Sequence, residues 1–127
     1  MKLSHFLSVK AIISLLFGVI LVAVPVAFMS VFGVVLDPAG SVMARLLGAM
    51  LVAVGLICWA ERSKEPNQLK GITFSLFVGD SIGLVILLMA QLAGMFNALG
   101  WVNVALWLLL VLGLGYFRFV QTDEASQ

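Results

Sequence analysis

The chain has very few of the residues that make a water-facing surface or a redox centre. Charged residues account for 10% of its 127 residues, against about 25% in soluble globular domains. The single cysteine, Cys58, excludes an internal disulfide and any Cys-x-x-Cys chemistry. The single histidine, His5, excludes a haem held by two histidines of this chain. Water-soluble domains, thiol–disulfide oxidoreductases and bis-histidine cytochromes are therefore excluded.

Reaction motifs are absent as well. The sequence has no Gly-rich phosphate loop, no His-Glu-x-x-His, no Gly-x-Ser-x-Gly and no pair of acids at metal-ligand spacing. Its formal net charge of +1 provides no basic patch for nucleic acid. The sequence therefore predicts no metal, no catalytic residue and no nucleic-acid partner, and it argues against an enzyme.

What the chain does contain is long apolar runs. Hydrophobic residues make up 63% of the sequence, and its mean hydropathy is +1.20. A helix needs about 20 apolar residues to cross a hydrocarbon core of about 30 Å. Four runs reach this length, at about 9–32, 42–60, 71–92 and 101–120. The sequence therefore predicts an all-α integral membrane protein, in which residues 1–127 form a single four-helix bundle.

If the four runs cross a membrane, almost all lysine and arginine residues lie on one side of it. Cytoplasmic loops of membrane proteins carry an excess of these residues, and only Arg45 falls toward the other side. We therefore expect both termini and the loop after residue 60 to be cytoplasmic. The six basic residues on the expected cytoplasmic side are Lys2, Lys10, Arg62, Lys64, Lys70 and Arg118.

The first run allows a second interpretation. Lys2 and Lys10, followed by an apolar stretch, also fit a cleaved signal peptide. The stretch is long for that role, and Pro25 lies close to any cleavage point. We favour a first membrane helix that Pro25 kinks in its outer third.

Small residues form stripes on the second and third runs. Because lipid gives no hydrophobic drive between helices, such residues mark close helix contacts. We expect the two stripes to pack on each other, with dimerisation through them as the alternative. The stripe of the second run contains Gly48 and Gly55, and that of the third contains Ser75, Gly79, Gly83, Ala90 and Gly94.

Asp80 is the one acid near the middle of an apolar run. An ionised carboxylate there is costly unless it is paired, wetted or protonated. Arg45 lies at a comparable depth, so we predict an ion pair or a water-bridged pair between Arg45 and Asp80. In the alternative, Arg45 reaches the outer headgroups. If the pair forms, it either fixes how the helices meet or provides a protonatable or ligand-binding group.

Three amides extend this prediction to a pocket. Gln91 shares a side of its helix with Asp80, and Asn97 and Asn103 flank the start of the fourth run. With Arg45, these side chains would line an outward-opening polar pocket. The alternative for the amides is hydrogen bonding at helix ends.

Two segments resemble parts of DoxX-like and related four-span proteins of bacteria. Together they cover about half of the chain. The matching features are an Arg-x-x-Gly entry (Arg45, Gly48), a later glycine (Gly55), an aromatic and basic end (Trp59, Arg62), and the segments Asn97–Trp101 and Gly115–Phe117. The resemblance implies a multi-pass bundle in the bacterial inner (plasma) membrane, of a kind linked to quinones or respiratory complexes. It assigns no catalytic residue.

Three functions remain open on the sequence alone. The first is a non-catalytic accessory or scaffold subunit, whose partners are the lipid bilayer and other membrane subunits or a second copy of the chain. The second is a binder of a lipidic molecule, such as a quinone, a sterol-like compound or a carotenoid, anchored by Arg45 and Asp80. The third is a proton-coupled transporter of small solutes that works as a dimer around Asp80.

Overall fold

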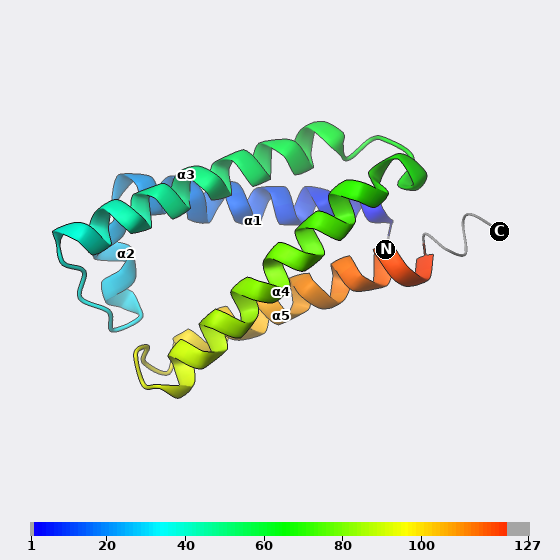
Figure 1. Ribbon diagram of the computed structural model, residues 1–127. Coiled ribbons are helices and arrows are strands. Elements are labelled where there is room, and N and C mark those ends of the chain that lie inside the picture. The colour runs from blue at the N-terminus through cyan, green and yellow to red at the C-terminus, as the bar shows by residue number, and fades with distance from the viewer. Residues whose placement is uncertain (1, 122–127) are drawn as a thin grey trace. The chain divides into compact units, whose positions relative to one another are not determined.

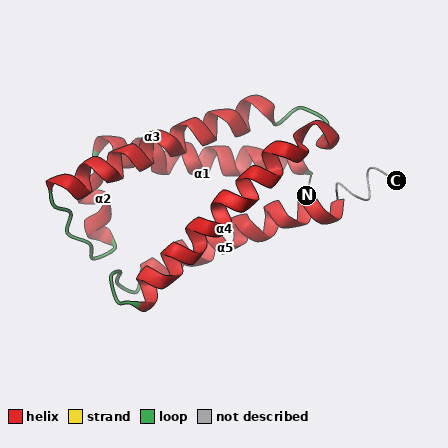
Figure 2. Cartoon of the chain, viewed as in Figure 1, coloured by secondary structure: helices red, strands yellow, loops and turns green. Residues whose placement is uncertain are grey.

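A computed structural model describes residues 2–121, and every regular element in that range is a helix. In chain order the elements are α1 (Leu3–Ala23), α2 (Pro25–Val31), α3 (Pro38–Glu61), the 3₁₀ turn η1 (Pro66–Leu69), α4 (Lys70–Leu92), α5 (Gly100–Gly115) and the π-helical turn η2 (Tyr116–Gln121) (Figures 1 and 2). Four stretches are long and apolar enough to cross a membrane: Leu3–Ala23, Pro38–Glu61, Pro66–Leu92 and Gly100–Val120. The predicted all-α class and the four apolar spans are confirmed.

The chain divides into two compact units, Met1–Arg62 and Ser63–Gln127. Unit 1 contains α1, α2 and α3, and unit 2 contains the remaining elements. Each unit has one pair of long helices at its centre, α1 with α3 and α4 with α5. The two units are described separately below.

The first span is shorter and begins earlier than its hydropathy predicts. It runs from residue 3 to 23 instead of 9 to 32, and the chain leaves helical geometry at Val24 (φ −137°, ψ 62°). The ring of Pro25 disfavours helical geometry in the residue before it. Proline fits the first turn of a new helix, because its missing N–H has no helical acceptor there. The predicted kink at Pro25 is therefore a complete break, after which α2 begins.

Helix α3 begins at a cap that the sequence encodes. Asp37 lies in extended geometry, and its Oδ1 accepts a hydrogen bond from the Gly40 N–H at 2.5 Å. Pro38 follows at the first helical position. This is a typical arrangement for starting a helix, in which the aspartate satisfies one of the free N–H groups of the first turn.

Helices α1 and α3 meet through glycine. A Cβ built at Gly18 would lie 2.7 Å from the Gly48 carbonyl oxygen, and a Cβ at Gly48 would lie 2.7 Å from the Gly18 carbonyl oxygen. Two turns further along α3, a Cβ at Gly55 would lie 3.0 Å from the Ala11 carbonyl oxygen. The expectation that this stripe packs on the third run is wrong, because α1 covers it. Glycine spacing shows that a face is used for packing but does not name the helix that covers it.

Helices α4 and α5 form the hairpin of unit 2. Helix α4 ends in a turn at Gly94, whose φ of +78° favours glycine. The start of α4 follows η1, which a reciprocal pair of hydrogen bonds caps. The Glu65 side chain accepts from the Gln68 N–H, and Gln68 Oε1 accepts from the Glu65 N–H at 3.2 Å. These two ends fix the length of α4 and bring its apolar stretch beside α5.

Candidate intramembrane polar site

Asp80 lies in the middle of a membrane-length helix. It is the eleventh of the 23 residues of α4, counting Lys70 as the first, and its side chain is partly buried. Its backbone carbonyl accepts a hydrogen bond from the indole Nε1 of Trp107 at 2.8 Å. A buried tryptophan usually finds a partner for its N–H group. Here that partner is the backbone of the only acidic residue within the apolar stretch of α4.

Trp107 reaches this carbonyl because Gly83 leaves space for its ring. A Cβ at Gly83 would lie 2.8 Å from a ring carbon of Trp107. The glycine therefore forms a notch that receives the indole, one helical turn from Asp80. Sequence reasoning placed Gly83 in a packing stripe but did not identify Trp107 as the group that fills it. The signal was present, since a tryptophan N–H inside an apolar run needs an acceptor.

A second polar group lies at the hairpin end of unit 2. The buried Gln91 donates through Nε2 to the Asn97 carbonyl at 3.2 Å, and Asn97 Oδ1 accepts from the Leu99 N–H at 3.0 Å. Gly100 lies against the same amide, because a Cβ there would stand 2.0 Å from Gln91 Oε1. These bonds close the turn between α4 and α5. The alternative role for these amides, hydrogen bonding at helix ends, describes Gln91 and Asn97.

Asn103 lies between the two groups. The contacts of Gly83 with Trp107 and of Gln91 with Gly100 give the register of the antiparallel pair. Asn103 is four residues from Trp107 on the hairpin side, whereas Asp80 is three residues from Gly83 on the other side. The two are therefore about 10 Å apart along the hairpin, at 1.5 Å per residue.

Unit 2 thus brings some of the predicted pocket residues together and separates others. Gln91 and Asn97 are in direct contact. Asp80 lies eleven residues before Gln91 on α4, or about 16 Å along the helix axis. The amides surround the hairpin turn, and Asp80 is associated with Trp107 at mid-helix.

Arg45 belongs to unit 1. It is the eighth residue of α3, counting Pro38 as the first, and its side chain is exposed. It lies one turn before Gly48, whose face packs on α1. Asp80 belongs to unit 2, so the pair between Arg45 and Asp80 stays a prediction.

The predicted small-residue stripe of α4 has three different surroundings. Its hairpin half includes Gly83, which Trp107 covers, and Gly94, which ends the helix. In the other half Ser75 is exposed, and a Cβ at Gly79 would meet nothing within 4 Å. Gly71, one further turn away, is equally open. We call Gly71, Ser75 and Gly79 the open face of α4.

The described residues contain no group of three or more His, Cys, Asp or Glu side chains able to hold a metal ion. Buried polar atoms without a hydrogen-bond partner among these residues are Thr73 Oγ1, Gln91 Oε1 and Arg118 Nε. The Gln91 oxygen faces Gly100, where an added Cβ would lie 2.0 Å from it. Thr73 and Arg118 lie at the opposite end of unit 2.

No protein-family model, curated protein or solved structure matches the chain. The resemblance to DoxX-like proteins is therefore neither supported nor opposed, and the function is argued from the chain's own geometry.

Proposed function

We propose that this protein is a small non-catalytic subunit or scaffold of a larger complex in the bacterial inner membrane. Four helical stretches long and apolar enough to cross a membrane support this proposal. The open face of α4, formed by Gly71, Ser75 and Gly79, carries the proposal. A helix of a partner subunit packs on this face.

The chemistry of the open face suits a helix contact in lipid. Lipid is as apolar as leucine, so membrane helices associate where small residues allow their backbones to approach closely. Glycine inside a helix costs about 1 kcal/mol relative to alanine. Gly83 offsets this through its contact with Trp107, but Gly71 and Gly79 make no such contact within unit 2. A partner helix would provide one.

We further propose that both termini are cytoplasmic. Lys2 and Arg62 flank the first pair of long helices, and Lys70 and Arg118 lie at one end of the second pair. Basic residues collect at the cytoplasmic side of membrane proteins. Arg45 is the exception, toward the opposite end of α3.

The test is purification in mild detergent followed by mass spectrometry of the associated proteins. Wild-type protein should elute as a complex with one or a few defined membrane partners. The variant Gly79→Leu should elute as a monomer, because its side chain fits within its own unit but occupies the docking face. The matched control is Val85→Leu, at a residue that is 57% exposed on the same helix, which should keep the partners.

Two results would contradict the proposal. One is a wild-type protein that is a stable monomer after mild solubilisation. The other is a Gly79→Leu variant that keeps every partner. Organic extraction of the same sample addresses the ligand-binding alternative, since one dominant quinone or carotenoid would favour it over a scaffold role.

A further inference from the structure

The end of unit 2 away from the hairpin turn carries Arg118, whose guanidinium lies over two aromatic rings. The Arg118 guanidinium lies 5.3 Å from the Phe119 ring centroid and 5.8 Å from that of Phe74. A cation within about 6 Å of an aromatic face is attracted to it. The two rings are themselves in edge contact, with centroids 6.3 Å apart. The guanidinium is therefore positioned by two rings, Phe74 from α4 and Phe119 from η2.

The polar part of Arg118 is incompletely satisfied. Its Nε is buried and has no hydrogen-bond partner among the described residues. Arginine carries five N–H donors in a planar fork that fits the oxygens of a phosphate. A buried donor without an acceptor is costly. Because this Nε is covered by protein atoms, an anion approaches the guanidinium from the side of its Nη groups.

Arg62 provides a comparison, because its guanidinium has a hydrogen-bond acceptor in the backbone. Its guanidinium also lies over a ring, 3.7 Å from the Trp59 centroid, and its Nη1 donates to the Trp59 carbonyl oxygen. Both arginines stack on aromatic rings, but Arg62 has a backbone acceptor and the Nε of Arg118 has none. The difference gives a matched pair for an experiment.

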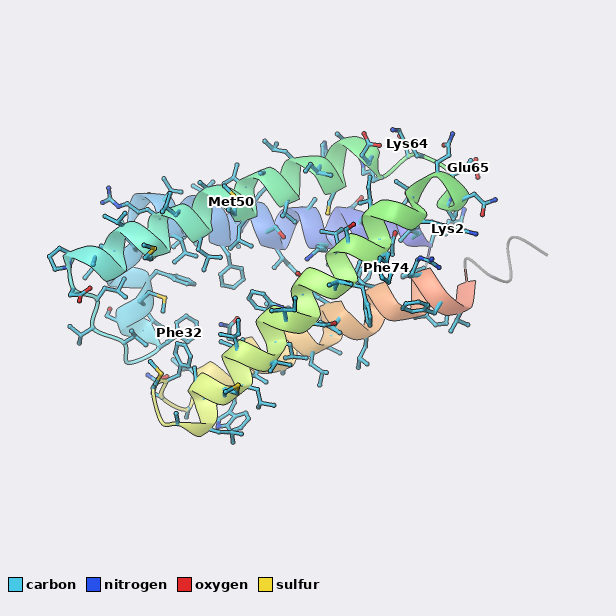
Figure 3. All side chains as sticks on the ribbon, viewed as in Figure 1. Lys2, Phe32, Met50, Lys64, Glu65 and Phe74 are labelled. Atoms are coloured by element: carbon cyan, nitrogen blue, oxygen red, sulfur yellow. The ribbon has the colours of Figure 1, made fainter. Side chains whose placement is uncertain are left out.

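A second cation lies on the same side. Lys70 is the first residue of α4 and is one helical turn before Phe74, so both lie on one face of the helix. Because Arg118 lies over Phe74, Lys70 and Arg118 face the same side of the hairpin. Figure 3 shows Phe74 on α4 beside the last turns of the chain.

The position of Lys70 and Arg118 at the ends of the apolar stretches indicates the kind of anion that binds. Lys70 lies near the start of the apolar stretch Pro66–Leu92, and Arg118 near the end of the stretch Gly100–Val120, so both are at headgroup level. Phe74 and Phe119 are 45% and 44% exposed beside them. A phospholipid fits both features. Its phosphate would lie on the two cations, and its acyl chains would lie along the two exposed rings. Basic clusters at the ends of membrane helices bind anionic headgroups in this manner.

We propose that Arg118 and Lys70, on the platform of Phe74 and Phe119, form a binding site for the phosphate of an anionic phospholipid headgroup. The site is independent of the subunit contact at the open face of α4. It makes the lipid a specific ligand at this end of the hairpin.

The test is native mass spectrometry of the full chain in a neutral detergent, titrated with short-chain phosphatidylglycerol or phosphatidylcholine. Wild-type protein should bind phosphatidylglycerol several-fold more tightly than phosphatidylcholine. Arg118→Gln and Lys70→Gln should each weaken phosphatidylglycerol binding about fivefold, the effect of one basic residue at an anionic surface. Arg62→Gln removes the same charge from the satisfied arginine and should bind like wild type.

Equal binding of the two lipids, or equal losses in Arg118→Gln, Lys70→Gln and Arg62→Gln, would overturn the proposal. Inorganic phosphate distinguishes a lipid from a soluble anion: complete displacement of the lipid at equal concentration would show a soluble-anion site instead. Lys70→Gln keeps the test decisive if Arg118→Gln does not fold, because it leaves both rings and the arginine in place.

Discussion

The two units join their long helices by different physical means. In unit 1, α1 and α3 approach until the backbone of each faces the glycine of the other, at Gly18 and Gly48. In unit 2, Trp107 of α5 fills the notch at Gly83 of α4 and donates to the carbonyl of Asp80. The first contact depends on the absence of side chains, and the second on one large side chain with a polar group.

The difference predicts how much stability each unit loses when a residue at its helix contact is substituted. A backbone carbonyl inside a helix cannot move aside, so an added methyl group at Gly48 must push the helices apart. A side chain can change its rotamer, so the contacts of unit 2 tolerate more. We therefore expect the largest losses of stability in unit 1 and smaller, graded losses in unit 2.

Gly48→Val should have the largest effect. Its Cβ would stand 2.7 Å from the Gly18 carbonyl oxygen and 2.9 Å from Leu21 Cβ. Overpacking of this kind costs about 3 kcal/mol. The free energy of unfolding in mixed micelles, measured by titration with sodium dodecyl sulfate, gives the value. Gly71→Ala is the control, since nothing lies within 4 Å of its Cβ. A Gly48→Val variant as stable as this control would refute the backbone contact.

Gly100→Ala should have the next largest effect, at about 2 kcal/mol. Its Cβ would lie 2.0 Å from Gln91 Oε1 and 2.6 Å from Phe96 Cβ. The amide can rotate away but then loses its bond to the Asn97 carbonyl. The same titration, repeated on Gln91→Ala and on the double variant, should show that the two losses are not additive. Strict additivity would mean that Gly100 and Gln91 are not in contact.

Trp107→Phe should cost about 1 kcal/mol, the usual net value of one hydrogen bond. It keeps an aromatic ring beside Gly83 but removes the donor to the Asp80 carbonyl. The emission of Trp107 itself provides an independent check, because its removal should delete the tryptophan signal that is least sensitive to an aqueous quencher. Trp101→Phe, at an exposed residue of the same helix, should leave stability unchanged. A larger loss for Trp101→Phe would reverse the assignment.

Asn97→Ala should have the smallest effect, about 0.5 kcal/mol, because the side chain is exposed and its Oδ1 accepts from the Leu99 N–H at the turn. The backbone carbonyl that accepts from Gln91 remains. Hydrogen exchange at the Leu99 amide should rise, whereas exchange at mid-helix amides of α4 should not. Faster exchange throughout α4 would show that Asn97 supports the whole hairpin.

Much of the fold was accessible from local sequence. Apolar run length gave the spans, although α3 begins at Pro38, behind the Asp37 cap, instead of at the predicted residue 42. Pro25 gave the place where the first helix is interrupted, although the hydropathy continues across it and led to a boundary at 32 instead of 23. Hydropathy reports the surroundings of a residue, whereas the break depends on backbone sterics. The two signals disagree at such a proline.

The candidate site was less accessible. The sequence allowed hydrogen bonding at helix ends for Gln91 and Asn97, but their partners are backbone groups that no side-chain pattern reveals. Gly83 was recognised as a packing residue, but no sequence pattern indicated that Trp107 of α5 covers it. The stacking of Arg118 on Phe74 joins residues 44 positions apart in the chain, so only the register of the hairpin brings them together.

The sequence by itself determined that the chain is helical, that four stretches suit a bilayer and that certain helix faces carry small residues. These are local properties, because helix formation and transfer to lipid depend on a residue and its near neighbours. The tertiary structure alone decided which helix covers each face: α1 covers Gly48, Trp107 fills the space at Gly83, and nothing in unit 2 covers Gly79. That choice depends on the fit between surfaces far apart in the chain, and periodicity does not encode the identity of the partner.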